Sequence, residues 1–170
     1  EMYDFAGGLR PHYEGFAAWL AAISPERLAS KQAEADSAFH RLGITFAVYG
    51  EKAGTERLIP FDIIPRIIPA SEWTVMEAGL RQRVKALNAF VHDIYHDQEI
   101  LGAGHIPYDQ VRNNAQFRRE MIGVDLPSGI YAHTAGVDMV RAGAGEYYVL
   151  EDNLRVPSGV SYMLEDRKMM

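Results

Sequence analysis

The sequence predicts an α+β protein in which helices and antiparallel hairpins occupy separate stretches of the chain. Apolar residues recur every three or four positions through residues 11–42 and 71–97, which is the period of a helix with one buried face. They alternate with polar residues at positions 44–48 and again from 129 to 153, which is the period of a strand. Stretches rich in glycine or proline separate these parts.

The composition is that of an ordinary globular protein. Of the 170 residues, 48% are apolar and 24% are charged, and 17 Lys and Arg against 23 Asp and Glu give a net charge of −6. This acidic balance argues against a nucleic-acid partner, although Arg81, Arg83 and Lys85 crowd one predicted helix. No apolar run reaches the ~18 residues of a membrane-spanning helix, and no basic segment followed by an apolar stretch begins the chain. We therefore expect a cytoplasmic protein with no membrane partner.

The absence of cysteine limits the chemistry that the chain can support. With no Cys in the sequence, thiol nucleophiles, disulfides and iron–sulfur clusters are excluded. Any bound metal must therefore be held by oxygen or imidazole ligands.

Residues 1–43 are expected to form a helical hairpin. Pro11 fits the first turn of a helix, and Ser24 is expected to end that helix and to cap the next one. Pro25 would then occupy the first position of the second helix, and Gly43 can end it in the left-handed conformation.

Residues 44–128 are expected to hold a β-hairpin, an extended segment and a long helix. Alternating side chains predict the hairpin, and the three prolines between positions 60 and 69 exclude both a helix and a central strand from the segment that follows. Arg66 is the single basic residue of that segment, and exposure to solvent is the simpler explanation of it. A short helix is expected around Tyr108 to Arg112.

The apolar stripe of the long helix runs from about Ser71 to Asp97. His92 and His96 lie near its end, and a separation of four residues places them on one face, as in some metal sites. No glutamate follows His92, as the chemistry of a zinc protease would require, and Asp93 points elsewhere on the helix. We interpret the histidine pair as an accidental match.

Residues 129–170 are expected to begin with two antiparallel strands. Alternation predicts one strand from Ile130 to Val140 and a return strand from Glu146 to Asn153. The glycines among residues 141–145 supply the turn between them, which makes antiparallel pairing the natural arrangement.

Three side chains that carry oxygen are expected to converge on this hairpin. Glu151 and Asn153 share a face because they are two residues apart, and Asp138 can join them from the neighbouring strand. Paired strands bring opposed residues to within ~5 Å, where two carboxylates repel unless a cation lies between them. A site with a few protein oxygens leaves other coordination positions to water and phosphate. Such a site suits Mg²⁺ better than zinc, or than calcium coordinated entirely by protein. Taken without any motif, such a hairpin is more often a solvent-exposed edge.

The loop after the return strand has the composition of an anion site. It reads Leu154-Arg155-Val156-Pro157-Ser158-Gly159, which combines a permanent cation, a proline and two residues whose backbone amides can point inward. An anion held by this loop would lie beside the predicted metal.

The hairpin and its loop resemble the circularly permuted ATP-grasp family. The matching segments are Gly136–Arg141 and Val149–Gly159. The resemblance extends upstream to Pro60–Arg66 and Gly79–Arg83, which look like the amino-terminal portion of the type 2 group. Members related to glutathione and glutathionylspermidine synthetases join carboxylates to amines through acyl phosphates. The resemblance therefore implies an ATP-dependent and Mg²⁺-dependent ligase with a small-molecule or peptide carboxylate and an amine as substrates.

The resemblance also implies roles for individual residues of the hairpin and loop. Asp138, Glu151 and Asn153 would be the metal ligands, with Glu151 as the bridging and catalytic ligand. Arg155 would bind ATP phosphate and stabilise the acyl phosphate, which makes it both a cofactor-binding and a catalytic residue. Ser158 and Gly159 would face the transferred phosphoryl group.

One position departs from the pattern of that family. Many ATP-grasp enzymes have an arginine two residues before the strand aspartate, whereas this sequence has Gly136 there. Arg66 or Arg141 is expected to take over that contact with the substrate.

Permutation would place the strands that hold adenine and supply lysines after the metal-binding strands. We therefore expect the rest of the site in the same polypeptide beyond residue 170, and residues 1–170 to form one truncated domain that is inactive alone. The start at Glu1 and the uncapped last ten residues agree with a chain cut from something longer. Two alternatives stay open, a catalytically inactive ATP-grasp-like binding module and a metal-assisted phosphohydrolase.

Overall fold

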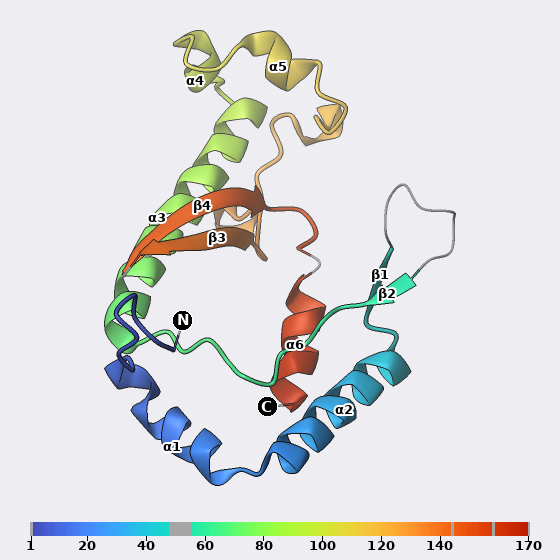
Figure 1. Cartoon of the computed structure of the whole chain (residues 1–170). Coiled ribbons are helices and arrows are strands. Elements are labelled where there is room, and N and C mark those ends of the chain that lie inside the picture. The colour runs from blue at the N-terminus through green and yellow to red at the C-terminus, as the bar shows by residue number, and fades with distance from the viewer. Residues whose placement is uncertain (1, 48–55, 144, 158, 170) are drawn as a thin grey trace. The chain divides into compact units, whose positions relative to one another are not determined.

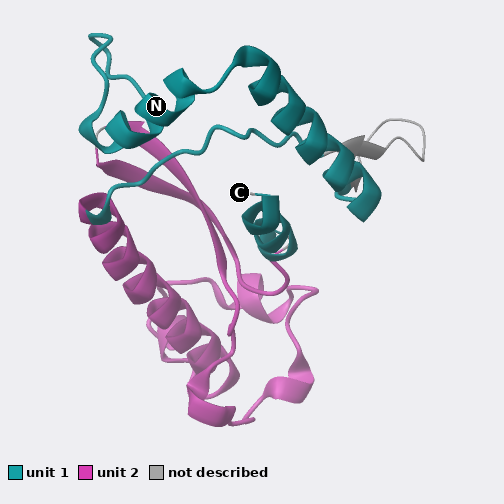
Figure 2. Cartoon of the chain, turned by 90° about the horizontal axis from the view of Figure 1, so that it is seen from below, with its two compact units in different colours: residues 1–70, 158–170 teal, residues 71–157 magenta. Residues whose placement is uncertain are grey.

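The structure, a computed structural model, describes residues 2–47, 56–143, 145–157 and 159–169 (Figure 1). The chain divides into two compact units, which Figure 2 colours separately. Unit 1 comprises residues 1–70 and 158–170, and unit 2 comprises residues 71–157. The expected single domain stays a prediction, because compact units of this kind can belong to one domain.

Two helices begin unit 1, as the sequence predicts. A 3-10 turn at Pro11–Tyr13 leads into α1 (Glu14–Ala22), and α2 follows over Pro25–Leu42. The Ser24 hydroxyl accepts a hydrogen bond from the Arg27 amide at 3.3 Å, which caps the first turn of α2. Gly43 ends α2 with a φ of +66°, the left-handed conformation that glycine adopts without strain. The two predicted helices are confirmed, and their packing as a hairpin stays a prediction.

The proline-rich segment lies against these helices and supplies the centre of unit 1. Tyr13 and Phe39 are almost completely buried, and the ring of Phe61 meets Phe39 edge to face at 4.8 Å between centroids. Gln32 donates to the Phe61 carbonyl at 2.6 Å, and the Ile67 amide donates to the Tyr13 hydroxyl at 2.8 Å. These bonds satisfy backbone groups of a segment whose prolines keep it out of regular structure.

Two short strands and one helix complete unit 1. Strands β1 (Thr45–Ala47) and β2 (Glu56–Leu58) pair antiparallel, which confirms the predicted hairpin, while its turn lies outside the described residues. Helix α6 runs over Gly159–Met169, a stretch for which the sequence analysis named only the end of the loop.

Unit 2 is built on the long helix α3 (Ala70–Tyr95), which matches the predicted span to within two residues. Two short helices follow, α4 (Glu99–Gly102) and α5 (Tyr108–Arg112). Helix α5 has the predicted bounds, whereas α4 was not predicted. The Asp93 carboxylate accepts from the amides of Glu99 and Ile100 at 2.9 and 3.1 Å, so this side chain serves the start of α4.

Strands β3 (Gly136–Gly143) and β4 (Glu146–Asn153) form an antiparallel hairpin that lies along α3 (Figures 1 and 2). Asp138 pairs with Glu151, but the next residue, Met139, pairs with Val149. Leu150 is therefore an extra residue on β4 and forms a β-bulge.

The first strand of this hairpin begins later than predicted. The expected strand started at Ile130, whereas β3 starts at Gly136. The Asn88 side chain on α3 accepts hydrogen bonds from the amides of Tyr131 and Ala132 at 2.7 and 2.9 Å. Because these amides are bonded to a helix, they cannot join a strand ladder, and the segment runs irregularly until Gly136. The alternation of side chains before residue 136 therefore does not mark a strand, and the predicted start at Ile130 is wrong.

Among the described helices, none combines the length and the apolar character needed to cross a bilayer.

Candidate functional site

The predicted metal ligands lie together on one face of the β3–β4 hairpin. Asp138 and Glu151 are direct cross-strand partners, so their side chains leave the sheet on the same side. Asn153 is two residues beyond Glu151, and its amide nitrogen donates to the Glu151 carboxylate at 3.0 Å. Both carboxylate residues are exposed, whereas Asn153 is half-buried.

The bulge at Leu150 determines which face carries Glu151. Tyr147 and Val149 line the groove against α3, and Asp152, three residues after Val149, contacts the same helix. Strict alternation would have placed Glu151, not Asp152, on the face of Val149. The extra residue turns Glu151 to the outer face, where Asp138 already points.

On the inner face, Asp152 ties the hairpin to the long helix. The Arg83 guanidinium donates to both Asp152 carboxylate oxygens, at 2.7 Å from Nε and 2.6 Å from Nη2. These hydrogen bonds hold the pKa of Asp152 below its ordinary value, although partial burial opposes the shift, and they raise the pKa of Arg83. Asp152 and Glu151 are adjacent in sequence, but their side chains lie on opposite faces of the strand.

A second anchor joins the start of α3 to the inner face of the hairpin. The Glu72 carboxylate accepts from the Arg141 guanidinium at 2.7 Å and from the Tyr147 hydroxyl at 2.6 Å. The side chains of Glu72 and Arg141 are only 16% and 14% exposed. Arg141 therefore lies on the face opposite Asp138, engaged with the helix, and its expected contact with the substrate stays a prediction.

The loop after β4 lies against the beginning of β3. A Cβ atom at Gly136 would approach the Pro157 Cβ to 2.8 Å and the Asn153 Cβ to 3.6 Å. Arg155 donates to the Gln116 side chain at 3.2 Å, a partner that no sequence motif marks. The loop thus follows directly from the strand that carries Glu151 and Asn153, and Arg155 is held by a segment far away in sequence.

Three other predicted residues are not among the described residues of unit 2. Ser158 lies outside the described residues. Gly159 begins α6 in unit 1, and Arg66 is an exposed residue of the proline-rich segment of unit 1. Their expected contacts with phosphate and substrate stay predictions.

The outer face of the hairpin has the donor set that suits a hard divalent cation. Among the described residues, neither Asp138 nor Glu151 has a basic side chain within ion-pair distance, whereas the neighbouring Asp152 is paired with Arg83. Because Asn153 donates through its nitrogen, its amide oxygen is the atom left for a cation. Two carboxylates and one amide oxygen fit Mg²⁺, which keeps several water ligands and prefers oxygen.

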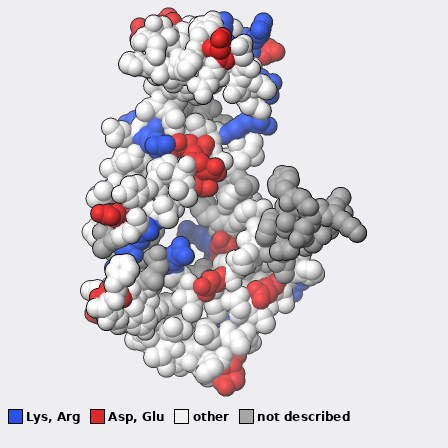
Figure 3. Space-filling view, turned by 45° about the horizontal axis from the view of Figure 1, so that its top comes forward, with Lys and Arg blue, Asp and Glu red and all other residues white. Residues whose placement is uncertain are grey.

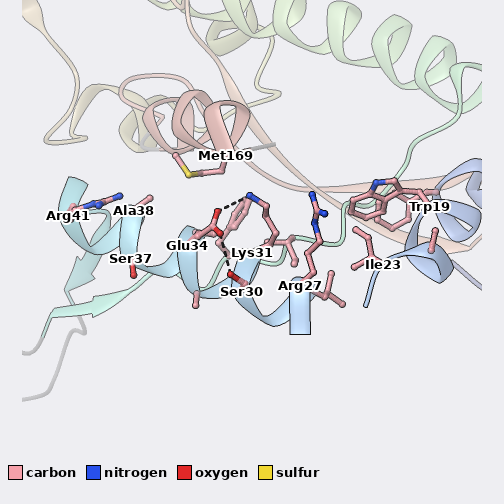
Figure 4. A pocket seen from close by; sticks show the side chains of 17 residues that line it. Trp19, Ile23, Arg27, Ser30, Lys31, Glu34, Ser37, Ala38, Arg41 and Met169 are labelled. Atoms are coloured by element: carbon pink, nitrogen blue, oxygen red, sulfur yellow. Dashed lines mark hydrogen bonds and ion pairs between the residues drawn. The ribbon is translucent and has the colours of Figure 1, made fainter. Parts of the chain in front are cut away.

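Each unit also contains a groove. In unit 2, a groove of about 580 Å³ separates α3 from the inner face of the hairpin and is lined mainly by apolar residues such as Met76, Leu80 and Val149. In unit 1, a groove of about 1250 Å³ follows α2, and Figure 4 shows Lys31 paired with Glu34 along it. Neither groove contains the hairpin carboxylates. Acidic and basic side chains are interspersed on the face drawn in Figure 3.

A further group of ligand-type side chains lies near the carboxyl end of α3. His92 and His96 on α3, which the sequence analysis treated as an accidental match, have Asp125 as a neighbour. Asp125 is far along the chain from both histidines and belongs to no motif, so sequence spacing could not have found it.

Comparison with known sequences places the hairpin inside a recognised family region. The sequence model of a family described as "A circularly permuted ATPgrasp" matches residues 65–170. This match contains α3, both strands of the hairpin and the loop that follows β4.

Curated relatives match the chain over nearly its whole length. An uncharacterized protein of Synechocystis is 46% identical over 100% of this chain, and one of Mycobacterium tuberculosis strain H37Rv is 45% identical over 100%. A Frankia casuarinae protein named "Putative glutamate--cysteine ligase 2-2" is 40% identical over 99% of this chain. The chain spans 35%, 30% and 19% of the lengths of these three relatives.

Proposed function

Because this chain belongs to the circularly permuted ATP-grasp family, we propose that it supplies the metal-binding hairpin of an ATP-dependent carboxylate–amine ligase. The family match and the name of the Frankia relative support a ligase of this type. In such a reaction, a substrate carboxylate attacks the γ-phosphorus of ATP, ADP leaves, and an amine then displaces phosphate from the acyl phosphate.

The pairing of Asp138 with Glu151 is the observation that carries the proposal. These two carboxylates face outward from adjoining strands, and no basic side chain of the described residues neutralises them. Unpaired carboxylates placed side by side repel each other. A bound cation would remove this electrostatic repulsion. A structural acid on this hairpin is instead paired, as Asp152 is with Arg83.

Asp138, Glu151 and Asn153 would hold Mg²⁺ in the proposed site. When bound, the ion would supply positive charge close to the terminal phosphates of ATP. The amide of Asn153 also donates a hydrogen bond to the Glu151 carboxylate, which limits the positions of that carboxylate before any ion binds.

Arg155 is proposed to contact the transferred phosphoryl group. Its guanidinium is always charged and can follow negative charge from one phosphate oxygen to another. The Gln116 side chain accepts a hydrogen bond from Arg155, which limits the positions that this long side chain samples. From the family resemblance, Ser158 and Gly159 are proposed to contact phosphate as well. Arg141 is left out of the site because it is engaged with Glu72 on the inner face.

The decisive experiment compares two neighbouring acids in the longest natural polypeptide that contains this sequence. Glu151→Gln should abolish the release of ADP that depends on a carboxylate and an amine, because an amide cannot provide the charge of the metal ligand. Asp152→Asn is the matched control, since its side chain lies on the inner face, and it should retain activity. Glutamate and cysteine are the first substrates to test, following the name of the Frankia relative.

The products distinguish the proposed ligase from the alternatives. A ligase yields amide product and phosphate in equal amounts, whereas a phosphohydrolase releases phosphate without forming an amide. A binding module would bind Mg²⁺ and ATP without turnover. Normal amide formation by Glu151→Gln would show that the hairpin is not the metal site of the reaction.

A further inference from the structure

His92 and His96 stack near the carboxyl end of α3. Their ring centroids are 4.0 Å apart with the planes inclined by 20°, and Asp125 approaches from the segment that leads towards β3. One possible ligand atom from each of the three residues lies within 4.8 Å of the other two. His96 is only 16% exposed, whereas the Asp125 side chain is 89% exposed. The cluster therefore sits at the surface with one partly buried member.

The hydrogen bonds of His96 fix which ring nitrogen carries the proton. Its Nδ1 lies 2.9 Å from the His92 carbonyl oxygen. A carbonyl can only accept, so Nδ1 must be protonated, and in the neutral ring Nε2 then carries the lone pair.

The same argument applies to His92 through Tyr131. His92 Nδ1 lies 3.1 Å from the Tyr131 hydroxyl, and that hydroxyl donates to the Val124 carbonyl at 3.3 Å. The Tyr131 hydroxyl has one hydrogen, which it donates to the Val124 carbonyl. Its oxygen therefore accepts a hydrogen bond from His92 Nδ1, so Nδ1 carries the proton and Nε2 carries the lone pair. Both histidines thus present the tautomer of a metal ligand, with the other nitrogen bonded to an orienting group.

The Nε2 atom of His96 lacks the partner that a buried nitrogen needs. It is buried and makes no hydrogen bond to any residue that the structure describes, although Asp125 Oδ1 lies 3.3 Å away. Tetrahedral coordination with bonds of about 2.1 Å separates two ligand atoms by about 3.4 Å. The separation of Nε2 and Oδ1 is therefore that of two ligands of one ion.

We propose that His92, His96 and Asp125 bind a divalent transition-metal ion of the Zn²⁺ type, at a site separate from the hairpin carboxylates. Two imidazoles and one carboxylate favour zinc and its neighbours over Mg²⁺, which prefers oxygen alone. Three protein ligands leave the fourth tetrahedral position to water. The ion would join the end of α3 to the segment around Asp125, which already contacts α3 through the Gly123 amide and the Tyr95 carbonyl at 2.9 Å.

Titration with Zn²⁺ alone tests this site in the longest natural polypeptide that contains the sequence. Isothermal titration calorimetry near neutral pH should find one zinc equivalent that is lost in His96→Ala and in Asp125→Asn. Loss of a ligand should weaken the affinity for zinc by more than about 100-fold. Removal of a group that only orients a ligand weakens it by about 100-fold at most. Tyr131→Phe should still bind one zinc equivalent, with an affinity about 10-fold weaker.

Two controls separate this site from other zinc-binding groups. His105→Ala removes an exposed histidine outside the cluster and should leave the titration unchanged. Glu151→Gln alters the hairpin and should also retain the zinc equivalent, which makes this test independent of the ligase proposal. With Co²⁺ in place of Zn²⁺, the intense visible absorption of a tetrahedral ion should appear in the wild type and vanish in His96→Ala.

An ion pair between protonated His96 and Asp125 is the competing explanation. It would leave the zinc affinity and the cobalt spectrum unchanged in Asp125→Asn. That result would overturn the metal site. So would zinc binding that His96→Ala leaves intact in a variant whose circular dichroism matches that of the wild type.

Discussion

Gly136 on β3 and Pro157 in the loop after β4 lie so close that a Cβ atom at position 136 would be 2.8 Å from the Cβ of Pro157. Real side chains do not approach each other this closely, so the loop can take its observed position only because residue 136 is glycine. As the sequence analysis noted, many ATP-grasp enzymes have an arginine at this point of the strand. Here the loop and an arginine side chain would compete for the same space, which gives the departure from the family pattern a steric cause.

Gly136→Ala should therefore destabilise unit 2 by about 1–3 kcal/mol, the usual cost of inserting a methyl group into occupied space. Chemical denaturation followed by circular dichroism measures this difference. Gly79→Ala on α3 is the matched control, because a Cβ there meets nothing within 4 Å and alanine favours a helix. Pro157→Gly in the Gly136→Ala background should recover part of the loss. Equal stability of Gly136→Ala and the wild type would contradict the steric argument.

Local signals in the sequence were sufficient for α1, α2, α3 and α5, but not for α4 and α6. Ser24 caps α2 and Gly43 ends it, because a hydroxyl at the first position and a residue without a Cβ at the last one act on neighbouring backbone groups only. Helix α5 was likewise predicted at Tyr108–Arg112. The hairpin itself could be anticipated, since a glycine turn between two alternating segments favours antiparallel pairing, whereas the pairing of Asp138 with Glu151 depends on a bulge.

Contacts between residues far apart in sequence were beyond such reasoning. The bulge at Leu150 decides the faces of Glu151 and Asp152, yet no residue type marks it. Asn88 lies on a helix more than forty residues before the amides that it binds. Its hydrogen bonds to these amides make β3 start later than the alternation suggests. Asp125 joins two histidines only because the segment after α5 returns to the end of α3.

Asn88→Ala should be among the more destabilising single substitutions in unit 2. It removes the acceptor of the Tyr131 and Ala132 amides, and an unsatisfied buried amide costs about 1–3 kcal/mol. We expect a loss of about 2–4 kcal/mol in the free energy of unfolding, measured by denaturant titration. Asn88→Asp retains the acceptor oxygens and should lose less. If Asn88→Ala were as stable as Asn88→Asp, the side chain could not be holding this segment.

Glu72→Ala should destabilise unit 2 more than Glu77→Ala, although both residues lie on α3 and contact an arginine. Glu72 and Arg141 are mostly shielded from water, whereas the side chains of Glu77 and Arg81 are 41% and 72% exposed. Hydrogen bonds between shielded charged groups contribute about 1.5–3 kcal/mol, and exposed ion pairs on a helix about 0.3–0.5 kcal/mol. Thermal unfolding of both variants makes the comparison. A larger effect at Glu77 would mean that the Glu72 contact does not anchor the hairpin.

The contact between Arg83 and Asp152 should make stability depend on pH in the acid range. The guanidinium holds the pKa of Asp152 below its ordinary value of 3.8, so the folded protein binds fewer protons there than the unfolded chain. The stabilisation is therefore complete above the ordinary pKa and is lost as the pH falls through the lower value of the folded state.

Denaturation of the wild type and Asp152→Asn across the acid range tests that sign. The difference in unfolding free energy between them should be constant near neutrality and should shrink as the pH falls below 3.8. Arg83→Gln should remove the same dependence while leaving the carboxylate in place, because the hydrogen bonds that lower the pKa come from the guanidinium. A difference that grows with acidity, or that Arg83→Gln leaves unchanged, would show that some other group sets the pKa of Asp152.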